Sequence, residues 1–184
     1  MVLIKKISDY VTRNKQVLPV ILDKRMNTYL ENFIGKIALD NGILPARIKD
    51  DEVWFDPELN NSNSRKQLYQ KVIDLSRVFE DPDINHYGDK RCEILKAGGT
   101  LSDTLAERAA VCRELSCFGH IVLTCYGINS YVANGIIPNE GGHAWIETNG
   151  NTVIDMNYIR KAVSKNAYIG KNPLNRQKLV EITF

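Results

Sequence analysis

The sequence lacks a long apolar run, a dense basic patch and any repeated or low-complexity segment. No stretch is apolar over the length of a signal peptide or a membrane span. The formal net charge is only +2, and no aromatic residues alternate with Lys or Arg, so neither nucleic acid nor a membrane is expected as a partner. We therefore expect a cytoplasmic protein, or one secreted without a classical signal peptide.

What remains is the composition of an ordinary globular protein. Hydrophobic residues make up 43% and charged residues 25% of the 184 residues, enough for one sizeable core. Apolar residues recur at helical spacing in much of the first half, and short strand-like runs follow Gly127. The sequence predicts one domain of the α+β class, with a mainly helical part over 1–98 and a catalytic core over 99–184.

The expected elements follow from periodicity and from turn residues. Helices are expected over residues 1 to about 45, from Ser64 to Phe79, from Asp89 to Lys96, from Ser102 or Asp103 to Ala110, and from Glu114 to Tyr126. Strands are expected over 130–133, 143–148, 152–155 and 179–184, with irregular chain over 50–64 and 156–178. Pro19 is expected near a helix start, and Asn41-Gly42, Gly98-Gly99 and Gly127 are expected to end helices.

Cysteine is scarce: the chain has only Cys92, Cys112, Cys117 and Cys125. Without an export signal, reduced thiols are expected. Three of these cysteines and His120 have the composition of a zinc site. However, they share one helical pattern, in which Cys117 projects away from Cys112, and one straight helix cannot surround a tetrahedral ion. No metal and no other cofactor is predicted.

Cys112 differs from the other cysteines because it stands where a strongly apolar helical pattern begins, beside the polar Arg113 and Glu114. The N–H groups and the positive dipole end at a helix start favour a thiolate. Most free cysteines are small buried hydrophobes, and the other three fit that description. Cys112 is therefore the predicted nucleophile.

His143 and Asp155 are the predicted partners of that thiol. His143 follows a Gly-Gly pair, and Asp155 ends a short apolar run. An imidazole beside a thiol accepts and returns its proton, and a carboxylate orients the imidazole. The alternatives are a structural histidine and a carboxylate that faces solvent. His86 has no thiol motif beside it and is expected at the surface.

The turn of the predicted hairpin over 143–155 decides whether these two side chains meet. A two-residue turn places His143 and Asp155 on opposite faces of the hairpin. A three-residue loop, Asn149-Gly150-Asn151, makes them diagonal neighbours on one face. In that register Asn157 lies opposite His143 and is the alternative orienting group. The triad therefore requires the three-residue loop or a bulge.

Several segments together resemble the transglutaminase-like superfamily of cysteine enzymes. The resemblance covers about residues 100–158 and implies a papain-like core, with the nucleophile at a helix start and His and Asp on adjacent antiparallel strands. It also implies that the backbone N–H of Cys112 is the first oxyanion donor; the second, an upstream side chain, matches no residue here. The segments are Ala110-Val111-Cys112-Arg113-Glu114-Leu115, Gly127-Ile128, Gly142-His143-Ala144-Trp145 and Val153-Ile154-Asp155.

The sequence departs from that family just before the nucleophile. Ala110 stands where the family usually has glycine, and a helical pattern runs into Cys112 from upstream. A continuous helix would remove the dipole advantage of Cys112. We therefore expect a break between about Glu107 and Val111.

The sequence predicts a cysteine-dependent acyl-transfer enzyme that acts on an amide of a protein or peptide. Its predicted catalytic residues are Cys112, His143 and Asp155. A peptidase, a glutamine deamidase and a transglutaminase are all open, and the small size is similar to that of bacterial effectors with this type of core. The alternative is a catalytically silent transglutaminase-like module that binds a protein partner.

Overall fold

A computed structural model of the chain describes residues 2–6, 9–11, 17–19, 24–41, 47–49, 52–55, 62–83, 85–86, 88–137, 141–148, 152–156 and 168–171. The helices are α1 (Lys24–Asn41), α2 (Ser62–Ser76), α3 (Asp89–Lys96), α4 (Leu101–Ala106) and α5 (Cys112–Cys125), with a 3-10 turn η2 (Arg77–Phe79). The strands are β1 (Val2–Lys6), β2 (Asp9–Val11), β3 (Val17–Pro19), β4 (Arg47–Lys49), β5 (Glu52–Phe55), β6 (Ser130–Ile137), β7 (Gly141–Thr148), β8 (Thr152–Asp155) and β9 (Tyr168–Lys171). The fold is α+β, as predicted.

The four-stranded sheet runs in the order β6-β7-β8-β9, and all its neighbouring strands are antiparallel. Between β7 and β8, Ile146 lies opposite Ile154 and Glu147 opposite Val153. This is the register of a three-residue connection, so the register that the triad requires is confirmed. Positions 143 and 155 therefore lie diagonally on one face of the sheet.

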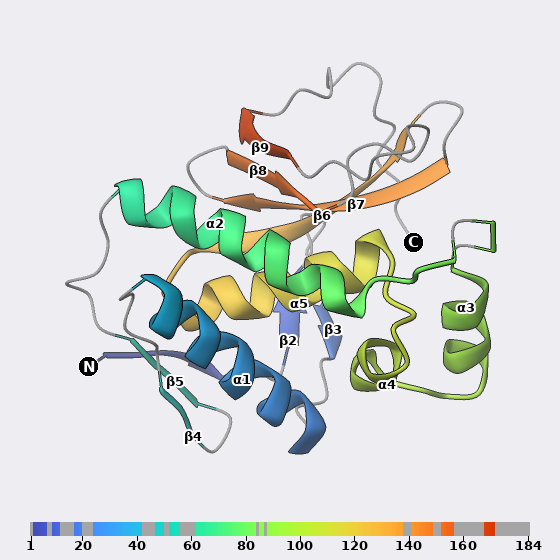
Figure 1. The fold of residues 1–184 in the computed structure, drawn as a ribbon, viewed down its shortest axis with the longest axis horizontal. Coiled ribbons are helices and arrows are strands. Elements are labelled where there is room, and N and C mark those ends of the chain that lie inside the picture. Colours follow the sequence, from blue (N-terminus) through green and yellow to red (C-terminus); the bar gives the residue numbers. More distant parts are fainter. Residues whose placement is uncertain are drawn as a thin grey trace.

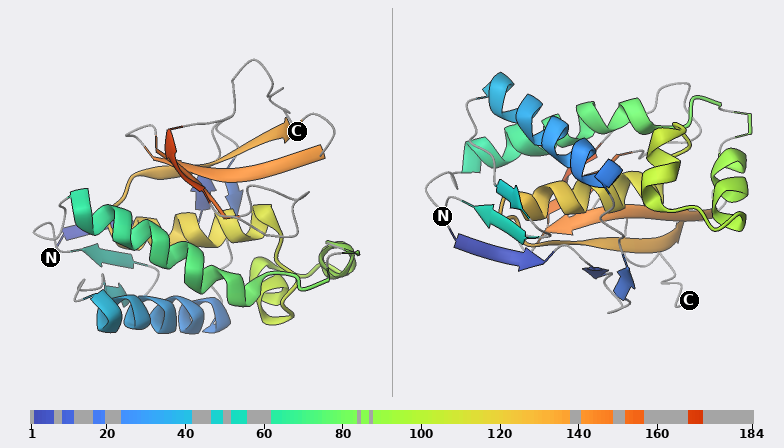
Figure 2. Two further views of the ribbon diagram at one scale, coloured as in Figure 1. Left: turned by 45° about the horizontal axis from the view of Figure 1, so that its top comes forward. Right: turned by 90° about the horizontal axis from the view of Figure 1, so that it is seen from below.

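Helix α5 is the centre of the core. It packs against β6 and β7 on one side and against α2 on another (Figures 1 and 2). All its residues except Arg113 and Thr124 are buried, as its almost entirely apolar pattern predicts. A side chain at Gly119 would collide with Met156 and Ile146, so this glycine lets the helix approach the sheet closely.

The predicted break before Cys112 is confirmed between α4 and α5. Helix α4 ends with two hydrogen bonds, from Ala109 N–H to the Thr104 carbonyl (2.9 Å) and from Arg108 N–H to the Leu105 carbonyl (3.1 Å). Arg108 itself adopts φ 51°, the left-handed conformation. This pairing is the Schellman motif, which usually has glycine at that position. Because arginine stands there instead of glycine, the sequence alone does not indicate that the helix ends at this point.

Because a side chain in the left-handed region costs ~1 kcal/mol, Arg108→Gly is expected to raise the free energy of unfolding by up to ~1 kcal/mol. Urea denaturation measures the change. As the matched control, Ala106→Gly places glycine inside the helix two residues earlier and is expected to lower the free energy of unfolding by a similar amount. A lower stability of Arg108→Gly would contradict the role assigned to this residue.

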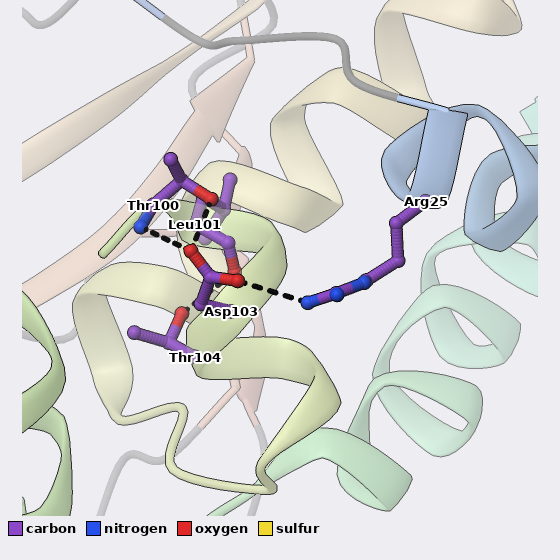
Figure 3. Close-up of polar contacts among 5 residues, drawn as sticks. All are labelled: Arg25, Thr100, Leu101, Asp103 and Thr104. Atoms are coloured by element: carbon purple, nitrogen blue, oxygen red, sulfur yellow. Dashed lines mark hydrogen bonds and ion pairs between the residues drawn. The ribbon is translucent and has the colours of Figure 1, made fainter.

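The start of α4 is fixed by Thr100 and Asp103 (Figure 3). The Asp103 carboxylate accepts hydrogen bonds from the Thr100 backbone N–H (2.7 Å) and hydroxyl (2.9 Å). Its other oxygen pairs with Arg25 of α1 at 2.9 Å, which ties α1 to α4. The prediction that Ser102 or Asp103 caps a segment reaching Ala110 is therefore wrong: Thr100 is the cap, and the helix ends at Ala106.

The predicted helix over the first 45 residues is wrong over residues 2–6, 9–11 and 17–19, although its end at Asn41 is confirmed. Strands β1, β2 and β3 stand there, and β1 pairs with β5 in a segment predicted to be a loop. Apolar runs of three or four residues fit a strand as well as a helix, so pairing with strands far along the chain determines which of the two forms. Likewise β9 forms in the predicted irregular segment by pairing with β8. Asn157 and the strand expected over 179–184 lie outside the described residues.

Candidate active site

Cys112 is the first residue of α5, and the residue is 5% exposed. The preceding Val111 is extended (φ −111°, ψ −170°), so the helix begins at the cysteine itself. The first N–H groups of a helix point out of its N-terminus, which places the Cys112 N–H at the end that bears the thiol. The thiol is hydrogen-bonded to His143.

The chain just before Cys112 is held by η2 and the residues that follow it. Ala110 N–H donates to the Phe79 carbonyl (3.1 Å), and Asp81 N–H donates to the Ala110 carbonyl (3.0 Å). The buried Asp81 carboxylate in turn accepts from Asp83 N–H (3.0 Å) and Gly88 N–H (2.9 Å). Ala110 is completely buried in this arrangement, so the structure accommodates alanine at this position.

Glu114 fixes the first turn of α5 from inside. One carboxylate oxygen accepts a long hydrogen bond from Val111 N–H (3.4 Å), and the other lies 2.6 Å from Arg91 Nε of α3. The contact with Arg91 is an ion pair between two largely buried side chains. A polar residue in a first helical turn usually faces solvent, but Glu114 is only 5% exposed, because Arg91 allows the carboxylate to be buried.

Ser116 joins the same helix to the sheet. Its hydroxyl donates to the Ala144 carbonyl at 3.2 Å, one turn after Cys112 and next to His143. Sequence reasoning gave this serine no role. The signal that could have found it is a small polar residue within an apolar helical pattern, since a buried hydroxyl needs a partner.

His143 and Asp155 meet as the register requires. His143 Nε2 lies 2.7 Å from Asp155 Oδ2, and the two residues are 5% and 0% exposed. Since Nε2 is bonded to the carboxylate, Nδ1 is the nitrogen that remains for the Cys112 thiol. The structure thus brings together the three predicted site residues, Cys112 from α5, His143 from β7 and Asp155 from β8, in that hydrogen-bonded order.

The charge of His143 depends on both partners. Burial lowers the pKa of the imidazole, but the hydrogen bonds that the ring donates to Asp155 and Cys112, together with the negative charges of these two groups, outweigh it and raise the pKa from 6.5 to about 9. The ring is therefore an imidazolium at neutral pH. An imidazolium beside a thiol favours the thiolate.

No protein-family model, curated protein or solved structure matches this chain.

The remaining cysteines are not among the groups that act on His143. Complete burial raises the pKa of the Cys125 thiol to about 12, which keeps it neutral. Cys117 is also buried in α5, as predicted, whereas the prediction that Cys92 is a small buried hydrophobe is wrong, because Cys92 is exposed on α3. The other histidines are likewise apart from the site: His86 is exposed, as predicted, and His120 bonds Ser130 at 2.9 Å in the core.

Within the described ranges, no group of three or more His, Cys, Asp or Glu residues is arranged to hold a metal ion. Nor does any helix in that part of the chain have the length and apolarity needed to cross a membrane.

Asp155→Asn is expected to lower the pKa of His143 from about 9 toward 6.5, because the amide keeps an acceptor oxygen and loses the negative charge. NMR titration of the ring measures this, and His143→Gln identifies its signals among those of the three histidines. Asp103→Asn, a surface carboxylate on α4, is the matched control and should leave the midpoint unchanged. A midpoint still near 9 in Asp155→Asn would contradict the assignment.

Proposed function

We propose that the chain is a cysteine-dependent acyl-transfer enzyme that acts on an amide of a protein or peptide, with Cys112, His143 and Asp155 as its catalytic residues. The observation that carries the proposal is the buried His143, which is hydrogen-bonded to the helix-start thiol on one side and to a buried carboxylate on the other. If His143 and Cys112 had only structural roles, neither residue would need to be hydrogen-bonded to the other.

In the first half of the reaction, the Cys112 thiolate attacks the amide carbon. The C–S bond forms, and the carbonyl electron pair moves to the oxygen, where the first-turn N–H of Cys112 would stabilise the oxyanion. The pair then returns, the C–N bond breaks, and the leaving amine takes a proton from His143. A thioester and a neutral imidazole remain.

In the second half, the neutral His143 accepts a proton from the acceptor while the acceptor attacks the thioester carbon. The C–S bond breaks, and Cys112 leaves as the thiolate beside the regenerated imidazolium. Asp155 holds the Nε2–H throughout and so keeps Nδ1 directed at the thiol. Water as the acceptor gives a carboxylic acid, as in a peptidase or glutamine deamidase; an amine gives a new amide, as in a transglutaminase.

The arrangement of elements supports the more specific proposal of a papain-like, transglutaminase-like core. The nucleophile begins a buried helix, and the histidine and aspartate stand on the neighbouring antiparallel strands β7 and β8, which pair in the required register. This likeness concerns arrangement, and the activity is argued from the side chains of the site.

The experiment is incubation of the purified chain with candidate proteins and peptides, followed by mass spectrometry. Cleaved backbone indicates a peptidase, conversion of glutamine to glutamate a deamidase, and cross-linked products a transglutaminase. Cys112→Ala is expected to abolish the product, whereas Cys92→Ala, at the exposed cysteine on α3, should keep it. Product formation by Cys112→Ala would disprove the proposal.

A further inference from the structure

We propose that Trp145 and Glu147 act as positioning residues for His143: Glu147 fixes the indole of Trp145, and the face of that indole stabilises the imidazolium. In treating His143 as a catalytic group, this inference rests on the proposed function. It adds a pair of residues that neither touch the thiol nor take part in proton transfer.

The geometry begins with alternation along β7. His143, Trp145 and Glu147 alternate with Ala144 and Ile146, whose side chains belong to the main core. The rings of His143 and Trp145 are stacked, with centroids 6.0 Å apart and planes inclined by 25°. Trp145 is only 2% exposed, so the contact is shielded from water.

Glu147 holds the far side of the indole. Its carboxylate accepts hydrogen bonds from Trp145 Nε1–H (2.9 Å) and from the hydroxyl of Tyr131 (2.6 Å), which stands opposite on β6. Glu147 is 4% exposed. Burial of a carboxylate is unfavourable unless its oxygens are hydrogen-bonded, and here each oxygen has a donor. The small Ala133, opposite Trp145 on β6, leaves room for the indole.

This arrangement favours a charged His143 in two ways. The face of an indole attracts a cation within about 6 Å of the ring centroid. A carboxylate on the indole N–H increases the electron density of that face and fixes its orientation. A loosely held indole would leave the imidazole free to turn away from Cys112, so the same contacts also restrain the ring plane.

Two other charged groups act on His143 directly, and the test must separate them from the proposed pair. Among the described residues these are the Cys112 thiolate from α5 and the Asp155 carboxylate from β8. On β6 the residue opposite His143 is Gly135, which carries no charge. The influence of Glu147 on the imidazole is indirect, because Glu147 is hydrogen-bonded to Trp145, which stacks on His143.

The experiment is NMR titration of the His143 ring in the full chain, comparing the wild type with Trp145→Leu and Glu147→Gln. Trp145→Leu removes the aromatic face, and its titration midpoint is expected to fall by ~0.5–1.5 pH units, the range to which cation–π energies correspond. Glu147→Gln keeps the size and one acceptor oxygen, and it removes the negative charge and the second acceptor. Its midpoint should fall by a smaller amount, and it remains informative if Trp145→Leu does not fold.

Val153→Ala is the matched structural control. Val153 packs in the same buried cluster as Trp145 and lies opposite Glu147 on β8, but it has no polar role. This variant should unfold at a lower urea concentration and titrate at the wild-type midpoint. If Glu147→Gln and every folded Trp145 variant titrate like the wild type, or if Val153→Ala lowers the midpoint as much as they do, the inference is overturned.

The alkylation profile of Cys112, measured on the same samples, distinguishes this inference from the proposed function. A midpoint that falls in both variants supports the positioning role even if Cys112 reacts like a free thiol, a result that would count against the enzyme alone. A selectively reactive Cys112 with an unchanged midpoint would overturn the positioning role alone.

Discussion

Cys112 is expected to react with iodoacetamide at pH 5.5 at least ~10 times faster than an added small thiol such as N-acetylcysteine. The reason is that the imidazolium of His143 keeps the thiol ionised where an ordinary thiol is almost entirely protonated. Between pH 5.5 and 7.5 the rate for Cys112 should stay nearly constant, whereas the rate for the small thiol rises about tenfold per pH unit. Peptide mapping assigns the label among the four cysteines.

The variant His143→Ala tests whether the imidazolium causes the reactivity of Cys112 at low pH. Without the imidazolium, the pH profile of Cys112 should approach that of the small thiol, and labelling at pH 5.5 should fall by at least ~10-fold. His86→Ala, at the exposed histidine, should behave as the wild type. Slow and uniform labelling of the wild-type cysteines would favour the catalytically silent binding module over the enzyme.

Asp155→Ala is expected to lower the free energy of unfolding by ~3 kcal/mol or more, because it leaves a buried imidazolium without its carboxylate. Acyl transfer should fall by at least ~100-fold, since the ring loses the bond that fixes its tautomer. Asp155→Asn should lose less stability and less acyl-transfer activity, because an amide oxygen can still accept the hydrogen bond from Nε2–H. Urea denaturation and turnover of an identified substrate measure the two effects, and equal losses in both variants would contradict this account.

The destabilisation should also depend on pH with a definite sign. The pKa of His143 is raised in the folded chain, from 6.5 to about 9. Stability from its charged partners is therefore complete below about pH 6.5 and is lost as pH rises through about 9. The difference in unfolding free energy between wild type and Asp155→Ala should be largest near pH 6 and smaller at pH 10. A difference that grows above pH 9 would refute the pairing.

The ends of three helices show what local sequence patterns can and cannot predict. Gly98 and Gly127 mark the ends of α3 and α5, and both adopt the left-handed conformation expected of glycine there. The third end has the same hydrogen-bond pattern around Arg108, so the sequence carries no visible signal. The break before Cys112 could therefore be expected only because the thiol chemistry required it. The left-handed conformation of Arg108 is set by packing in the folded chain and not by its local sequence.

The first twenty residues show the opposite case, in which the local pattern was misleading. Their short apolar runs suit a helix or a strand equally well, and pairing of β1 with β5, some fifty residues away, selects the strand. Similarly, Glu114 has the sequence signature of an exposed residue in a first helical turn, but the Arg91 side chain from another helix makes its burial possible.

By itself, the sequence determined which cysteine begins the central helix, which histidine and aspartate are candidates to face it, and the α+β class, because these follow from periodicity and residue chemistry within short windows. The tertiary structure decided whether those three residues meet. That depended on the register between β7 and β8, on the helix end at Arg108, and on contacts from Ser116, Arg91 and Glu147. Each of these is set by partners distant in the sequence, whose burial and hydrogen bonds exist only in the folded chain.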